Sequence, residues 1–139
     1  MYRSTTHLAL LLLTALLTVS CGDDDPVFIA PPAPPQIDES FDGTLTPFSA
    51  RTHFFQAQNP GEIIAQISAI TPDTTIVGIS IGTGNGFACQ AAVSTEQAGL
   101  NSGLIGVANA PGVLCIRVYD PSNEGLPAAI TYSIRVRHY

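Results

Sequence analysis

The chain has 139 residues, enough for one domain of ordinary size but not for two. Charged residues make up only 12% of it, every basic residue is Arg, and the formal net charge is −6. Binding to nucleic acid depends on Lys and Arg meeting phosphates, so the composition excludes nucleic acid as an expected partner.

The first element is an apolar run from Leu8 to Val19, preceded by a segment with Arg3 and no acid. A run of twelve residues is too short to cross a bilayer as a helix, which takes about 20. Such a run is typical of a signal peptide. A buried core helix is the alternative, but the run has no amphipathic face. We therefore expect residues 1–20 to be a signal peptide.

The run ends in Thr18-Val19-Ser20-Cys21, which resembles a bacterial lipobox. The resemblance implies that Cys21 receives a diacylglyceryl group and becomes the new N-terminus. Two or more acyl chains hold a protein stably on a membrane, whereas one is marginal. We therefore expect a lipid-anchored protein of the bacterial cell envelope. Because Gly22 and not Asp follows Cys21, the outer membrane is the expected location.

Residues 21–37 are expected to be the lipidated cysteine and a Pro-rich linker. Five of the eleven prolines lie between Pro26 and Pro35. Proline fixes φ and removes the amide donor, so this segment can neither form a helix nor pair inside a sheet. We expect an extended spacer that rises about 3.1 Å per residue.

Residues 38–139 are expected to form an all-β domain. Short apolar segments alternate with breaks such as NPGE, TPDT and GTGNG, a spacing typical of sandwiches and barrels. The sequence predicts a single antiparallel β-sandwich, jelly-roll-like, with about eight strands. The expected strands are residues 40–45, 51–57, 62–70, 75–82, 87–94, 103–109, 113–119 and 129–138.

The last two of these strands alternate most clearly between apolar and polar residues. Leu114, Ile116 and Val118 share one face, and a second apolar face comprises Ile130, Tyr132, Ile134 and Val136. Because successive side chains of a strand point to opposite sides, these faces should look into the core. The opposite faces would then present Arg117, Tyr119, Thr131, Ser133, Arg135 and Arg137 to solvent.

Several of these segments resemble the bacterial pre-peptidase C-terminal domain, from Asp38 to Val136. The resemblance rests on FDGTL, THFF, NPGEIIAQISAI and above all NAPGVLCIRVYDPSNEGLPAAITYSIRV. It implies a small jelly-roll-like sandwich with an accessory or binding role. These are packing motifs, so no catalytic residue is carried over from the family.

An enzyme is not expected. His53 is the only plausible general base in the mature chain, and it lies beside Phe54 and Phe55 in a predicted strand, where a structural role is the simpler interpretation. The GTGNG segment from Gly82 to Gly86 superficially matches a phosphate loop. No helix is predicted after it, so a hairpin turn is expected instead.

A basic patch is the first candidate binding site. If the last two strands pair, Arg117, Arg135 and Arg137 gather with Tyr119 on one face and offer a docking site for an anionic glycan or lipid headgroup. The alternative, which we favour, is cross-strand pairing of these arginines with Glu62, Glu96 or Asp120.

A calcium site is a weaker candidate. Asp120, Asn123 and Glu124 cluster in one predicted loop and carry hard oxygen ligands. The same residues are common in turns, so we expect no metal and no cofactor.

Cys89 and Cys115 remain as an even pair once Cys21 is lipidated, and in an oxidising compartment this favours a disulfide. Strict alternation places Cys115 outward with Arg117, but Cys89 inward with Phe87 and Val93. The pairing therefore requires a bulge in one strand or a reversed face for residues 87–94. Two free thiols are the alternative.

These observations favour a non-catalytic envelope lipoprotein whose sandwich binds a polysaccharide or a protein. A structural or assembly subunit that docks by a strand edge is the alternative.

Overall fold

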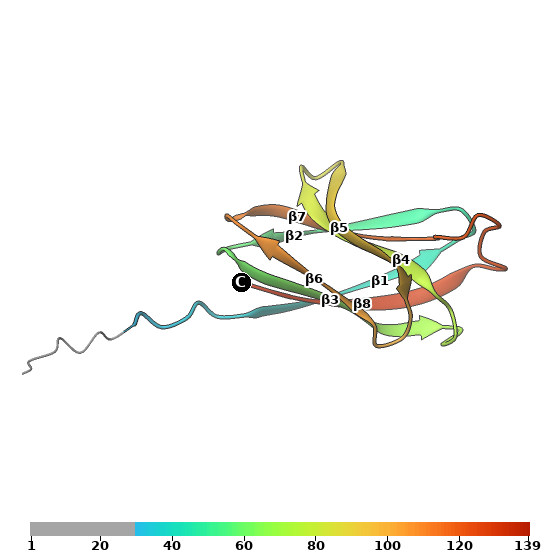
Figure 1. Ribbon diagram of the computed structural model, residues 1–139, viewed down its shortest axis with the longest axis horizontal. Coiled ribbons are helices and arrows are strands. Elements are labelled where there is room, and N and C mark those ends of the chain that lie inside the picture. Colours follow the sequence, from blue (N-terminus) through green and yellow to red (C-terminus); the bar gives the residue numbers. More distant parts are fainter. Residues whose placement is uncertain (1–29) are drawn as a thin grey trace, which may run out of the picture. The chain divides into compact units, whose positions relative to one another are not determined.

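Eight antiparallel strands account for most of residues 30–139, which are the residues that the computed structural model describes (Figure 1). The expected signal peptide and Cys21 lie outside the described residues. Residues 30–36 are exposed and belong to neither a helix nor a strand. In the described range, no helix is long and apolar enough to cross a membrane. The strands are β1 (Ile37–Leu45), β2 (Ala50–Ala57), β3 (Gly61–Thr71), β4 (Val77–Gly84), β5 (Cys89–Ala98), β6 (Gly103–Ala108), β7 (Gly112–Tyr119) and β8 (Ile130–His138).

The strands form two four-stranded sheets. The β8 sheet has the order β1-β8-β3-β6, and the β7 sheet has the order β2-β7-β4-β5. Strand β1 pairs with β8, β2 with β7, β3 with β6 and β4 with β5. The chain thus runs out to the β4–β5 hairpin and returns antiparallel along its own path. This is the jelly-roll arrangement, and it confirms the predicted fold class.

The core lies between the two sheets and follows the predicted alternation. Ile116 and Val118 of β7 face Ile134 and Val136 of β8, and all four are fully buried. The remaining fully buried aliphatic side chains come mainly from the other central strands, β3 and β4, and from Leu45 at the end of β1. Apolar residues at every second position therefore supply one inner layer from each sheet.

The strand bounds differ from the prediction most around the β4–β5 hairpin. Strand β4 ends at Gly84 and β5 begins at Cys89, so Phe87 lies in the connecting loop and not in a strand. The side-chain oxygen of Asn85 accepts hydrogen bonds from the backbone N–H groups of Phe87 (3.0 Å) and Ala88 (2.8 Å). These bonds occupy donors that a strand would need for its ladder, which is why the loop interrupts the predicted strand.

Candidate functional site

A disulfide joins Cys89 at the start of β5 to Cys115 in β7, as predicted. The two Cα atoms are 5.8 Å apart, which lies within the ordinary range for disulfides. Cys115 is fully buried although it lies on the outer face of the β7 sheet, next to exposed Arg117. The disulfide and the start of β5 therefore cover part of that outer face.

A bulge in β5 brings the two cysteines to the same face. The register steps from Ile81↔Val93 to Gly82↔Ala91, which leaves Ala92 as an extra residue. Val93 therefore faces inward while Cys89, four residues earlier, faces outward with Cys115. The sequence required either a bulged strand or a reversed face for residues 87–94, and the bulge is correct.

Two glycines in β4 lie at close contacts: Gly82 faces the start of β5, and Gly84 faces a side chain of β2. Gly82 pairs with Cys115 on one side and with Ala91 on the other. A Cβ atom at position 82 would overlap the carbonyl oxygen of Gln90. At position 84 it would lie 2.7 Å from the ring of Phe54. Gly82 thus serves close packing of backbone on backbone and Gly84 leaves room for the Phe54 ring, and the segment is a hairpin, not a phosphate loop.

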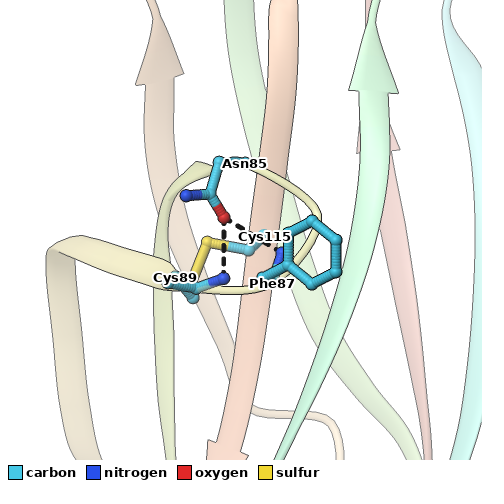
Figure 2. The surroundings of a disulfide bond; sticks show 5 residues. Asn85, Phe87, Cys89 and Cys115 are labelled. Carbon is cyan, nitrogen blue, oxygen red and sulfur yellow. Dashed lines mark hydrogen bonds between the residues drawn. A yellow bond between two sulfur atoms is a disulfide. The ribbon is translucent and has the colours of Figure 1, made fainter.

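The loop between β4 and β5 presents Phe87 to solvent. Its side chain is 97% exposed, the largest value among the exposed large apolar residues of the described chain. Figure 2 shows the ring pointing away from the Cys89–Cys115 sulfur atoms, with the Asn85 side chain bonded to the backbone beside it. We call residues Gly84 to Cys89 the braced loop, because the disulfide and Asn85 both hold it.

The sequence on both sides of the braced loop is uncharged. The sequence from Thr74 to Thr95 contains no Asp, Glu, Lys, Arg or His. On the outer face of β7, Val113 is 39% exposed, two residues from Cys115. The loop is therefore an apolar and amide-rich projection on a strongly acidic protein.

The predicted basic patch does not form. Strands β7 and β8 lie in different sheets, so Arg117 is on one outer face and Arg135 and Arg137 are on the other. The prediction assumed that two consecutive strands with matching alternation pair with each other. In this topology each of them pairs with an earlier strand instead.

Arg135 and Arg137 pair with Asp38, which was not among the expected partners. The Nε atoms of both arginines lie 3.2 and 3.4 Å from Oδ1 of Asp38, on the neighbouring strand β1. Cross-strand ion pairing, the favoured interpretation, is confirmed for Arg135 and Arg137 only, and Glu62, Glu96 and Asp120 are wrong as their partners. Arg117 lies instead over the ring of Tyr119, with 5.9 Å between its guanidinium carbon and the ring centroid.

His53 is partly buried between the sheets, where its Nε2 atom is 2.8 Å from the hydroxyl of Tyr132. The ring of Phe41 stacks on it, with centroids 5.1 Å apart. Burial lowers the pKa of His53 below 6.5, Arg51 lowers it further, and Asp42 acts in the opposite direction. Burial also raises the pKa of Tyr132 to about 12. A hydroxyl is thus within reach of the imidazole, but it is a very weak acid, and the imidazole has lost basicity.

Asp120 binds the backbone of two loops, β1–β2 and β7–β8. Its carboxylate accepts backbone N–H groups from Phe48 (2.8 Å), Ser122 (2.9 Å) and Leu126 (2.7 Å). Burial would raise the pKa of Asp120, but these three donors outweigh it and the pKa is lowered. The carboxylate therefore has a structural role. Within residues 30–139, no three His, Cys, Asp or Glu side chains are grouped so that they could hold a metal ion.

A polar depression of about 390 Å³ lies on the outer face of the β8 sheet. Thr44, Thr131 and Thr71 lie side by side across β1, β8 and β3. The hydroxyl of Ser133 donates to the carboxylate of Asp42 in the next row. The depression offers hydroxyl groups and one carboxylate, and its one aromatic lining residue, Tyr132, is only 3% exposed.

Phe87 and Asp38 are the residues that sequence reasoning missed as site residues. The signal for Phe87 was present, since Asn-Gly just before it is a strong hairpin signal and leaves the next residue near a turn. No local signal identifies Asp38, because its partners follow it by 97 and 99 residues.

Comparison with known proteins finds similarity among solved structures. No protein-family model matches the chain, and no curated protein is detectably similar to it. A solved structure of similar fold is described as Aeromonas hydrophila PliG, a periplasmic lysozyme inhibitor of g-type lysozyme. The match has a TM-score of 0.52 and 14% identity, and covers 71% of this chain and 83% of that one. At this identity the likeness shows the fold alone.

Proposed function

We propose that this protein is a lipid-anchored, non-catalytic binding protein of the bacterial cell envelope. Cys21 is the proposed anchor, and the Pro-rich segment is the spacer that holds the sandwich away from the membrane. Removal of residues 1–20 takes away Arg3 and no acid, so the mature chain carries a formal charge of −7. An outer-membrane location is part of the proposal.

The observation that carries a binding function is the exposure of large apolar side chains outside the core. Phe87 is 97% exposed in the braced loop, and Ile105 and Val107 are 59% and 69% exposed on β6. Large apolar side chains that stay exposed on a small acidic domain indicate surfaces that meet a partner. The polar depression on the β8 sheet supports polysaccharide binding less well, because its one aromatic lining residue, Tyr132, is buried.

The structural neighbour supports this proposal at the level of architecture. Its description names it as an inhibitor of a lysozyme, so a sandwich of this kind can act by binding another protein. A g-type lysozyme is therefore a sensible first protein to test with this chain. The resemblance to the pre-peptidase C-terminal domain supports the same general role, that of an accessory module.

A second candidate function, docking by a strand edge, is favoured by strand β6. It is an edge strand, and its six residues, Gly103 to Ala108, include no charge and no proline. In natural proteins, charged residues, prolines or bulges usually protect edge strands from pairing with other chains. A partner strand that added to β6 would cover Ile105 and Val107.

Site-specific photocrosslinking in the producing cells tests the proposal. The chain has no Lys, so amine-reactive reagents cannot report its contacts. Benzoylphenylalanine is placed, one variant at a time, at Phe48, Phe87 and Val107 of the full-length protein, and purified g-type lysozyme is tested separately for binding to the detergent-extracted protein. We expect a discrete protein adduct at one position. Adducts at none of the three, together with no lysozyme binding, would contradict a binding function.

A further inference from the structure

We infer that the braced loop is the docking element of this protein, and that Phe87 inserts into an uncharged, apolar pocket of a folded, basic partner protein. This rests on the proposed binding function and deepens it, because it names the contact residue and the chemistry of the partner.

The position of Phe87 has no explanation in the fold itself. At 97% exposure the ring contributes almost nothing to the core. Phe48, which is 70% exposed, differs in this respect, because its ring lies against Gly125 in the β7–β8 loop. An aromatic residue kept in water at the tip of a hairpin has the properties of an interface anchor.

The loop is held in place more firmly than a hairpin turn requires. The disulfide ties its last residue to β7, and Asn85 accepts two N–H groups from within the loop (Figure 2). Because Gly86 has a φ of +88°, the turn is confined to a conformation that suits glycine. Ordering such a loop on binding costs little entropy, so more of the contact energy of Phe87 appears as affinity.

The shape of the loop selects a folded protein as the partner. In Figure 1 the hairpin between β4 and β5 rises out of its sheet. Phe87 lies in the loop of this hairpin and is almost fully exposed, so it belongs to a convex projection. A convex anchor needs a concave pocket, which a folded protein can supply. A glycan chain cannot enclose a ring in this way, and flat aromatic platforms suit it better.

Charge indicates a basic partner and argues against a membrane. The mature chain has a formal charge of −7, which attracts basic proteins and repels anionic lipid headgroups. The segment from Thr74 to Thr95 has no Lys or Arg that could hold the loop on such a surface. Because the segment carries no charge, docking desolvates no ion on this side of the interface.

The test measures affinity with the protein that the photocrosslinked position 87 captures, identified by mass spectrometry and then purified. Wild-type protein is compared with Phe87→Ser and with the control Leu100→Ser, an exposed apolar side chain outside the binding surfaces named above. We expect Phe87→Ser to weaken binding at least about 30-fold, the size of an interface hot spot, and Leu100→Ser to change it less than about threefold. A Cys89→Ser/Cys115→Ser variant that retains its far-ultraviolet spectrum should also bind more weakly.

The opposite results separate this inference from the proposed function. Adducts at position 107 or 48 but not at 87 would leave a binding protein and overturn the role of the loop. Adducts of lipid at position 87 would identify a membrane contact and likewise overturn it. Equal affinity of wild type and Phe87→Ser for the captured protein would contradict the inference directly.

Discussion

Gly82 lies at the closest approach of two backbones in the β7 sheet. A side chain there would overlap the carbonyl oxygen of Gln90, which belongs to the backbone and cannot turn aside. We expect Gly82→Ala to lower the free energy of unfolding by an amount near or above the upper end of the usual overpacking range of about 1–3 kcal/mol. The control is Gly112→Ala, since a Cβ atom at position 112 would meet nothing within 4 Å. Urea unfolding of both variants measures the difference, and equal stabilities would contradict the packing described for Gly82.

His53 should make part of the stability depend on pH. Its pKa is lowered in the folded protein, mainly by burial, so the unfolded chain binds more protons as the pH falls below about 6.5. The stabilising contribution is therefore present above that pH and is lost as the pH falls through the folded pKa. In His53→Gln this contribution is absent, and the loss of stability between about pH 7.5 and pH 5 should be smaller.

Unfolding free energies of wild type and His53→Gln at these two pH values provide the measurement. Other titrating groups are common to both proteins, so only the difference between their pH dependences is interpreted. Parallel pH dependences would show that the pKa of His53 is the same in the folded and in the unfolded protein. That result would contradict the burial of His53 between the sheets.

At the scale of elements, one disulfide cross-links the β4–β5 hairpin to strand β7 of the same sheet. Cys89 and Cys115 are 26 residues apart, and loop-closure entropy for this separation suggests a stabilisation of roughly 3–4 kcal/mol. We expect Cys89→Ala/Cys115→Ala to lose about that amount and to become insensitive to reductant. Unfolding with and without dithiothreitol checks both statements. A wild-type protein whose stability does not change on reduction would contradict the role of the bond.

The strands were more predictable than their partners. The period-two alternation of β7 and β8 is a local pattern, so their buried faces could be identified from the sequence. The pairing partner of each strand depends on the global path of the chain. The local alternation therefore does not predict it. The predicted patch of Arg117, Arg135 and Arg137 is wrong for this reason.

The bulge at Ala92 shows a second limit of prediction. Alternation assigns every residue of a strand to a face, and a single extra residue reverses the assignment for everything before it. Alternation puts Cys89 and Cys115 on conflicting faces but does not tell which strand is irregular. The apolar residues after Gly86 match a β pattern, so Phe87 was predicted in a strand, and only the hydrogen bonds of Asn85 show the loop.

At the scale of the whole molecule, the proposed protein combines a lipid anchor with a binding domain. The sandwich, the disulfide and the exposure of Phe87 belong to residues 30–139. The anchor depends on Cys21 and on the segment before it, and it remains a prediction from the sequence. Both parts imply the same compartment, because lipidated envelope proteins and structural disulfides are found outside the reducing cytosol.

The mass of the intact mature protein, extracted with detergent from the producing cells, tests this joint claim most directly. We predict a chain that begins at Cys21, carries acyl groups on that residue, and is two hydrogens lighter than the form with free thiols at Cys89 and Cys115. Cys21→Ala should abolish the acyl mass and release the protein from the membrane fraction. A mature chain that begins at another residue, carries no acyl mass, or has two free thiols would contradict the account.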